Sequence, residues 1–99
     1  MAGSKIWSAE DRTGGPLDEI LDAVRAAIPK LRVERLVGTW PADDDNVYWL
    51  QHEGREVQVN TQDNGRLPTT IEVDDSRLDT TTVTAAASFI VKELSAQTE

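Results

Sequence analysis

Two runs of strand-forming residues, separated by a turn, lie at the centre of the chain. Val47–His52 and Arg55–Thr61 are rich in β-branched and aromatic side chains, and Glu53-Gly54 separates them. Apolar and polar residues alternate in the second run, which is typical of a strand with one buried face. The first run is apolar on both faces. The pattern therefore predicts a β-hairpin in which one strand has more apolar surface than a single core can cover.

The length of the turn decides which of these side chains face the core. A two-residue turn at Glu53-Gly54 holds the glutamate at positive φ, which costs a residue with a Cβ about 1–2 kcal/mol. A three-residue turn, His52-Glu53-Gly54, needs only the glycine in the left-handed region. Turn chemistry therefore favours the three-residue turn and its register.

The two registers expose different side chains on the outer face of the sheet. The favoured register exposes Tyr48, Leu50 and His52, whereas the other exposes Val47 and Trp49. Burial of a large apolar side chain contributes about 1.5–3 kcal/mol, so the exposed group requires an explanation. Either the N-terminal segment or the long loop before the next strand folds over it, or a partner protein covers it.

Apolar residues with helical spacing predict one helix before the hairpin and another near the end of the chain. The first begins at Pro16, because proline favours the first turn of a helix, and ends near Ile28, because Pro29 cannot continue it. The last helix follows a short approach at residues 78–82. The apolar positions of the two helices are Leu17, Ile20, Leu21, Val24 and Ile28, and Val83, Ala86, Ala87, Ile90 and Leu94.

Two further strands complete the predicted sheet. Leu31–Trp40 precedes the hairpin and Thr69–Val73 follows it, with turn signals at residues 43–46 and 62–65. Because adjacent strands are joined by tight turns, we expect a four-stranded antiparallel meander. The predicted fold class is an α+β two-layer sandwich, with an N-terminal and a C-terminal helix packed on one face, in the order α-β-β-β-β-α.

The predicted domain covers residues 16–95, and 99 residues suffice for one domain with a modest core. Residues 1–15 mix glycine, serine and charged side chains without a sustained period, which indicates a flexible N-terminal arm. Such an arm can dock its single indole, Trp7, on an exposed sheet face. If it docks in this molecule, Trp7 covers the outer face of the hairpin. Residues 96–99 are expected to fray.

An acidic surplus limits the partners. The chain has 18 acidic and 10 basic residues, a net charge of −8 at pH 7. Nucleic-acid binding is not expected, because it requires a basic face. A basic protein surface would be attracted, and the acidic turn at Asp43, Asp44 and Asp45 would form a charged rim for that contact. The alternative is that the surplus serves only to keep a small domain soluble.

The sequence has no pattern typical of catalysis, a metal site or a cofactor. Cysteine is absent, and His52, the only histidine, cannot form a zinc site alone. The carboxylates at residues 43–45 lack the alternate spacing and the glycine of a calcium loop. No serine lies in a nucleophile motif, and the acidic side chains cluster in turns, where we expect them to be solvated and without any means of raising a pKa for catalysis. We therefore expect no enzyme activity, cofactor or metal.

The chain also lacks membrane signals. No apolar run approaches the roughly 18 residues that span a bilayer, and residues 1–15 lack the apolar core of a secretion signal. We therefore expect a soluble, cytoplasmic protein without membrane contacts.

The predicted order of elements is similar to that of the double-stranded RNA-binding domain, which also places helices at both ends of a small antiparallel sheet. That domain needs a basic cluster to bind phosphates, whereas the last helix here offers Lys92 alone. The resemblance in element order therefore does not imply RNA binding. In size and charge the chain resembles immunity proteins, antitoxins and phage-encoded inhibitors. This resemblance implies a protein that occludes a basic, nucleic-acid-handling site.

The sequence leaves three hypotheses about function. The first is a non-enzymatic inhibitor that docks on a basic protein surface. The second is a self-associating subunit, a homodimer in which the outer face or a free edge strand pairs with its own copy. The third is a small-molecule binder with Trp40 or Trp49 lining its pocket. The candidate partner-binding residues of the first hypothesis are Tyr48, Leu50, His52, Trp49, Asp43, Asp44 and Asp45, with Val47 beside Trp49 in the alternative register.

Overall fold

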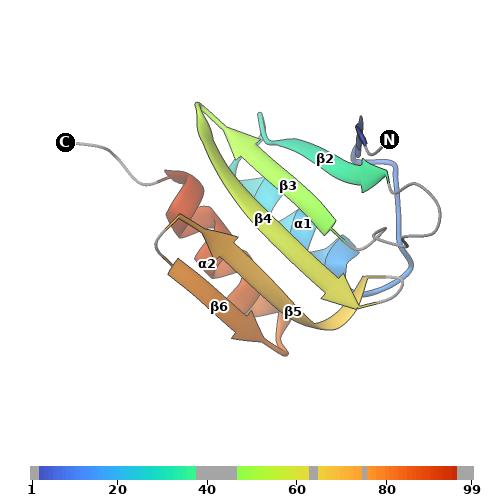
Figure 1. Cartoon of the computed structure of the whole chain (residues 1–99), viewed down its shortest axis with the longest axis vertical. Helices are drawn as coiled ribbons and strands as arrows, with labels where there is room; N and C mark the ends of the chain where they lie inside the picture. The colour runs from blue at the N-terminus through green and yellow to red at the C-terminus, as the bar shows by residue number, and fades with distance from the viewer. Residues whose placement is uncertain (1–2, 38–46, 63–64, 75, 96–99) are drawn as a thin grey trace.

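The computed structural model describes residues 3–37, 47–62, 65–74 and 76–95. Within them, six antiparallel strands form one sheet whose spatial order follows the chain order, and both helices pack on one face of it (Figure 1). The predicted α+β class is confirmed, but the four-stranded meander is wrong, because two further strands lie at the edges of the sheet. The elements are β1 (Gly3–Ile6), α1 (Pro16–Ala27), β2 (Arg32–Val37), β3 (Val47–His52), β4 (Arg55–Gln62), β5 (Arg66–Val73), β6 (Ser76–Thr80) and α2 (Val83–Ser95).

Strand β1 lies in the segment that the sequence pattern assigned to a flexible arm. It pairs antiparallel with β2, and the Trp7 amide continues the ladder by donating to the Val33 carbonyl at 2.9 Å. The Trp7 side chain is buried on the helix side of the sheet, so the expectation that it covers the outer face is wrong. A four-residue strand with one neighbouring indole is too short to show a period, and pairing with β2 supplies its stability. The folded unit therefore begins before Pro16.

Strand β6 was predicted only as an approach to the last helix. It pairs with β5 through a two-residue connection, with Val73 opposite Ser76 and Ile71 opposite Leu78. Leu78 is the only large apolar residue in this strand, so the sequence alone gives no alternation to detect. Backbone pairing with the one-sided strand β5 determines its conformation.

The β3–β4 turn has two residues, so the favoured three-residue turn is wrong. Glu53 adopts φ 48° and Gly54 φ 82°, and His52 lies opposite Arg55. This register directs Tyr48 and Leu50 toward the helices, where they are 1% and 0% exposed. In this register the Tyr48 ring meets Trp7 edge to face, with ring centroids 5.5 Å apart, and such a contact adds about 0.5–1.5 kcal/mol to the burial of the rings, which offsets the cost of about 1–2 kcal/mol for glutamate in the left-handed region. Core packing therefore overrides local turn preference.

The core lies between the sheet and the two helices. Helix α1 begins at Pro16 as predicted, and both helices turn their predicted apolar faces inward. No helix among the described residues is both long and apolar enough to cross a membrane. The buried helical residues are Leu17, Ile20, Leu21, Val24, Ala86, Ala87, Ile90 and Leu94.

Candidate functional site

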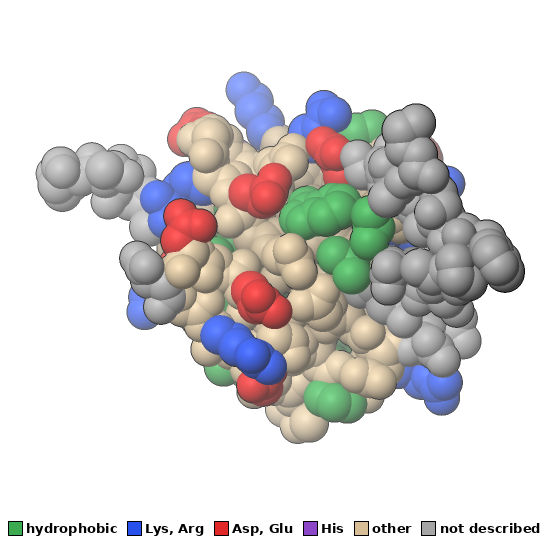
Figure 2. All heavy atoms as spheres, in the orientation of Figure 1, with side chains coloured by type: hydrophobic (Ala, Val, Ile, Leu, Met, Phe, Trp, Pro, Cys, Tyr) green, Lys and Arg blue, Asp and Glu red, His purple; other side chains and the backbone are tan. Residues whose placement is uncertain are grey.

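The sheet has a second face that neither helix covers, and Figures 1 and 2 view the molecule from this side. Strand pairing aligns one row of side chains across all six strands of this outer face. The row comprises Ile6, Glu34, Trp49, Gln58, Glu72 and Arg77. Successive residues of a strand point to opposite faces, so residues two positions away from these share the outer face.

Hydrophobic side chains gather on one part of this face, and acidic side chains lie near them (Figure 2). Ile6 is 50% exposed, and Leu36, Val47 and Trp49 are partly buried. We call these four residues the apolar patch. Together they form a continuous apolar surface across β1, β2 and β3 at one end of the sheet. Neither helix covers this surface.

Next to the apolar patch the outer face is polar, and several of its side chains are hydrogen-bonded to one another. Trp49 Nε1 donates to Gln58 Oε1 at 3.3 Å, and Gln58 Nε2 donates to Asn60 Oδ1 at 3.2 Å. Asn60 Nδ2 in turn donates to Glu72 Oε2 at 3.2 Å. These bonds hold the indole and the three polar side chains in one arrangement. Less side-chain conformational entropy is therefore lost when a partner binds.

A second polar cluster occupies the β5–β6 side of this face. The Thr70 hydroxyl donates to Asp79 Oδ1 at 2.6 Å, and Arg77 Nε lies 3.4 Å from the same oxygen. The hydroxyl bond is the main reason that the pKa of Asp79 lies below its ordinary value of 3.8. A carboxyl group with a lowered pKa contributes stability above its ordinary pKa, and this contribution is lost as the pH falls through the lowered value.

The Thr70→Val variant should therefore raise the pKa of Asp79 toward 3.8, because the charged form loses its hydroxyl donor. NMR titration of the aspartate side-chain carboxyl carbons measures this change. Thr84→Val, on the exposed side of α2, is the matched control and should leave the pKa of Asp79 unchanged. An unchanged Asp79 titration in Thr70→Val would show that the hydroxyl does not determine the shift.

The structure separates the residues that the sequence proposed for partner binding. Tyr48 and Leu50 are buried under the helices and cannot contact a partner in the folded chain. His52 shares their side of the strand near the turn, with Nε2 3.9 Å from Glu53 Oε1. Trp49 and Val47 lie on the outer face, as the alternative register required. The residues at 43–45, and Trp40, lie outside the described residues.

Two members of the apolar patch were missed by sequence reasoning. The sequence pattern assigns Ile6 to the arm, and it predicts a strand that contains Leu36 but does not link Leu36 to the hairpin face. Only the pairing of Ile6 with Glu34, and of Glu34 with Trp49, brings β1 and β3 to the same face. The isolated apolar pair Ile6-Trp7 was the one available signal, since its two side chains point to opposite faces of an edge strand.

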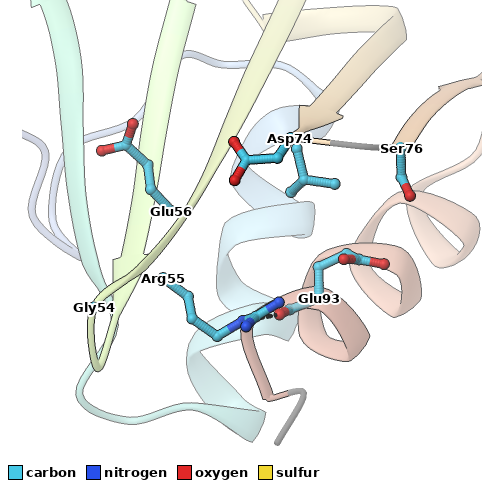
Figure 3. A pocket seen from close by; sticks show the side chains of 7 residues that line it. Gly54, Arg55, Glu56, Asp74, Ser76 and Glu93 are labelled. Atoms are coloured by element: carbon cyan, nitrogen blue, oxygen red, sulfur yellow. Dashed lines mark hydrogen bonds between the residues drawn. The ribbon is translucent and has the colours of Figure 1, made fainter. Parts of the chain in front are cut away.

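A cavity of about 440 Å³ opens between the β3–β4 turn, the β5–β6 turn and the end of α2 (Figure 3). Arg55 extends across it, and Arg55 Nε donates to the Glu93 carbonyl at 2.6 Å. This carbonyl belongs to the last turn of α2, where backbone acceptors lack helical partners. Arg55 thus holds the end of α2 against β4.

Among the described residues, no group of three or more histidine, cysteine, aspartate or glutamate side chains is arranged to hold a metal ion. Comparison with protein-family models, with curated proteins and with solved structures finds no match to this chain. Any functional conclusion therefore depends on the chemistry of the outer face.

Proposed function

We propose that this protein is a non-enzymatic binding module that docks on a basic protein surface and occludes it, in the manner of an inhibitor or immunity protein. The observation that carries the proposal is the apolar patch on a sheet face that has no helical cover among the described residues. Exposed apolar groups with a polar border are typical of protein interaction sites.

Trp49 is the anchor of the proposed contact. It lies between Glu34 and Gln58 in the row that crosses all six strands, and its indole N–H is already bonded to Gln58. A large aromatic side chain in a fixed orientation buries much area at little entropic cost, which is why tryptophan is common among the residues that dominate binding. The surrounding polar side chains would exclude water from this anchor.

Charge selects the partner. The chain carries a net charge of −8. The strand register places Glu56, Glu72 and Asp79 on the outer face with Trp49, together with Arg77 and with Arg32, which donates to Glu34 at 2.9 Å. Negative charge around an apolar anchor attracts a basic surface and accelerates association, and this effect weakens as salt rises.

The Trp49→Ala variant should weaken binding to the natural partner by about 30-fold or more, because loss of a dominant interface residue costs about 2 kcal/mol or more. The partner is first captured from the native host with the wild-type chain, and affinities are then measured by titration calorimetry. Phe89→Ala, which truncates a partly buried aromatic side chain on α2, is the matched control and should leave the affinity within about twofold. Unchanged affinity in Trp49→Ala together with loss in Phe89→Ala would place the contact on the helices and overturn the proposal.

The electrostatic part of the proposal has its own test. Replacement of Asp43, Asp44 and Asp45 by asparagine should slow association and flatten its salt dependence. The control neutralises Glu10, Glu19 and Asp22, which are exposed residues on the N-terminal segment and α1. If the two triple variants slow association equally, net charge alone is responsible, and the three aspartates at residues 43–45 make no specific contribution.

A further inference from the structure

Strand β6 forms one edge of the sheet, and no described strand pairs with its outer side (Figure 1). The residues that flank a two-residue hairpin turn form a hydrogen-bonded pair, and such pairs alternate along an antiparallel ladder. Ser76 and Leu78 therefore bond to β5 through their backbone. The backbone N–H and C=O groups of Arg77 and Asp79 point the other way, so two donors and two acceptors lie along a free edge.

The side chains of β6 have a symmetric charge pattern. Arg77 and Asp79 lie on either side of Leu78, and both side chains are well exposed, at 65% and 62%. Ser76 and Thr80 follow at the next positions outward. A second copy could be related to the first by a two-fold axis that passes between the two Leu78 residues. Each arginine would then face an aspartate of the other copy, and the Ser76 hydroxyl would face the Thr80 hydroxyl.

We propose that β6 pairs antiparallel with β6 of a second copy of this chain, centred on Leu78, so that two six-stranded sheets form one continuous sheet. In this register Arg77 lies opposite the second copy's Asp79, and the two residues exchange both of their backbone hydrogen bonds. The pairing satisfies every outward backbone group of the two residues in both chains.

The charge pattern selects this register over its neighbours. A shift that retains backbone pairing moves the strands by two residues and places Arg77 opposite Arg77, or Asp79 opposite Asp79. Like charges directly opposite each other destabilise a strand pair. Edge strands that avoid pairing carry charges that repel a copy. Here the two charges are opposite and lie at positions related by the two-fold axis, so the edge is complementary to itself.

The side chains of β5 next to β6 on the outer face also favour this dimer register. Glu72 lies opposite Arg77 across the β5–β6 ladder, and Thr70 lies opposite Asp79. In the dimer the row would run from Glu72 through Arg77 to the second copy's Asp79 and Thr70, with charge alternating in sign. Arg77, which in the single chain meets its own Asp79 at 3.4 Å, gains a carboxylate directly across the interface.

The contact is expected to be weak and reversible. One pair of five-residue strands forms an interface near the lower end of specific complexes, and the net charge of −8 on each copy opposes association. We expect a dissociation constant on the order of 100 µM at physiological salt. The contact uses neither Trp49 nor the aspartates at residues 43–45, so its test is independent of docking on a partner.

Charge exchange provides the test. Sedimentation velocity between about 10 µM and 1 mM should show a concentration-dependent dimer for the wild-type chain. Arg77→Glu and Asp79→Arg should each lose self-association by tenfold or more, because each places like charges across the interface. An equimolar mixture of the two variants should form a heterodimer, since both cross-strand pairs are then of opposite sign. The double variant Arg77→Glu/Asp79→Arg should self-associate again.

Arg12→Glu and Glu10→Arg make the same charge changes at exposed positions far along the chain from β6, and they should leave the dimer within about twofold. Circular dichroism verifies that each variant is folded. A wild-type chain that stays monomeric at 1 mM, or single variants that fail to associate when mixed, would overturn the proposal.

A cysteine scan reads the register directly, because the chain contains no cysteine. Leu78→Cys places two thiols opposite each other in a pair that is not hydrogen-bonded, where the Cα atoms are about 4.5 Å apart and within reach of a disulfide. This variant should form a covalent dimer on mild oxidation, whereas Arg77→Cys and Asp79→Cys should react much more slowly. Rapid crosslinking at 77 or 79 instead would show a different register and would contradict the proposal.

Discussion

Truncation of Trp7 to alanine should lower the free energy of unfolding by about 3–5 kcal/mol, the range measured for large aromatic side chains in protein cores. Trp7 is 5% exposed and meets Tyr48 edge to face, with ring centroids 5.5 Å apart. The Arg35 guanidinium lies 5.0 Å from the Trp7 ring centroid, which adds a cation–π contact. Loss of the indole would therefore remove core area and two specific aromatic contacts at once.

Urea unfolding followed by circular dichroism measures this loss, and Trp49→Ala is the matched control. Trp49 is partly exposed on the outer face, so its truncation should cost only about 1 kcal/mol. The Trp7→Phe variant should lose less than Trp7→Ala, because Trp7 Nε1 is buried without a hydrogen-bond partner among the described residues and phenylalanine removes that unpaired group. Equal losses for Trp7→Ala and Trp49→Ala would contradict the assignment of Trp7 to the core.

The Gly65→Ala substitution should destabilise the fold by about 2–4 kcal/mol, through backbone strain and overpacking together. Gly65 adopts φ 72°, and an added Cβ would meet the Thr13 side chain and lie 2.9 Å from Leu17 Cβ. Thr13 cannot easily move away, since its amide and hydroxyl both bond Asp18 Oδ1, at 2.8 and 3.0 Å. Gly65 is thus a point of close approach between the start of β5 and the start of α1.

Gly54→Ala separates the two contributions to this loss. Gly54 has a similar φ of 82°, but an added Cβ there meets no atom within 4 Å. This variant should lose only the strain contribution, about 1 kcal/mol. Thermal and urea unfolding of the two variants, compared with the wild type, gives both values. If Gly65→Ala costs no more than Gly54→Ala, the packing of α1 against the start of β5 is looser than the structure indicates.

Part of the fold could be predicted because its signals are local. The stripe Leu17, Ile20, Leu21 and Val24 recurs with the period of one helical turn, and the proline at residue 16 marks the helix start. The alternation at Val57 and Val59 likewise identified a one-sided strand. These features depend on spacing within one element, so no knowledge of its neighbours was needed.

The candidate binding face was predicted only in part. The sequence required that some apolar side chains of β3 remain outside the core, and it offered two alternative sets. Turn preference selected the wrong set, because it takes into account only the cost of positive φ at Glu53. The observed set depends on how Tyr48 and Leu50 pack in the whole core, which includes Trp7, and Trp7 is separated from Tyr48 by two intervening elements, α1 and β2.

By itself, then, the sequence determined two amphipathic helices, a central hairpin with surplus apolar residues and an acidic balance of charge. The tertiary structure alone decided that Gly3–Ile6 and Ser76–Thr80 are edge strands and that Trp49, rather than Tyr48, lies on the outer face. The physical reason is that edge strands gain their stability from backbone hydrogen bonds with a neighbour, which leave no periodic trace in side chains. The register of β3 was likewise decided by burial summed over the whole core, which exceeds the preference of one turn residue.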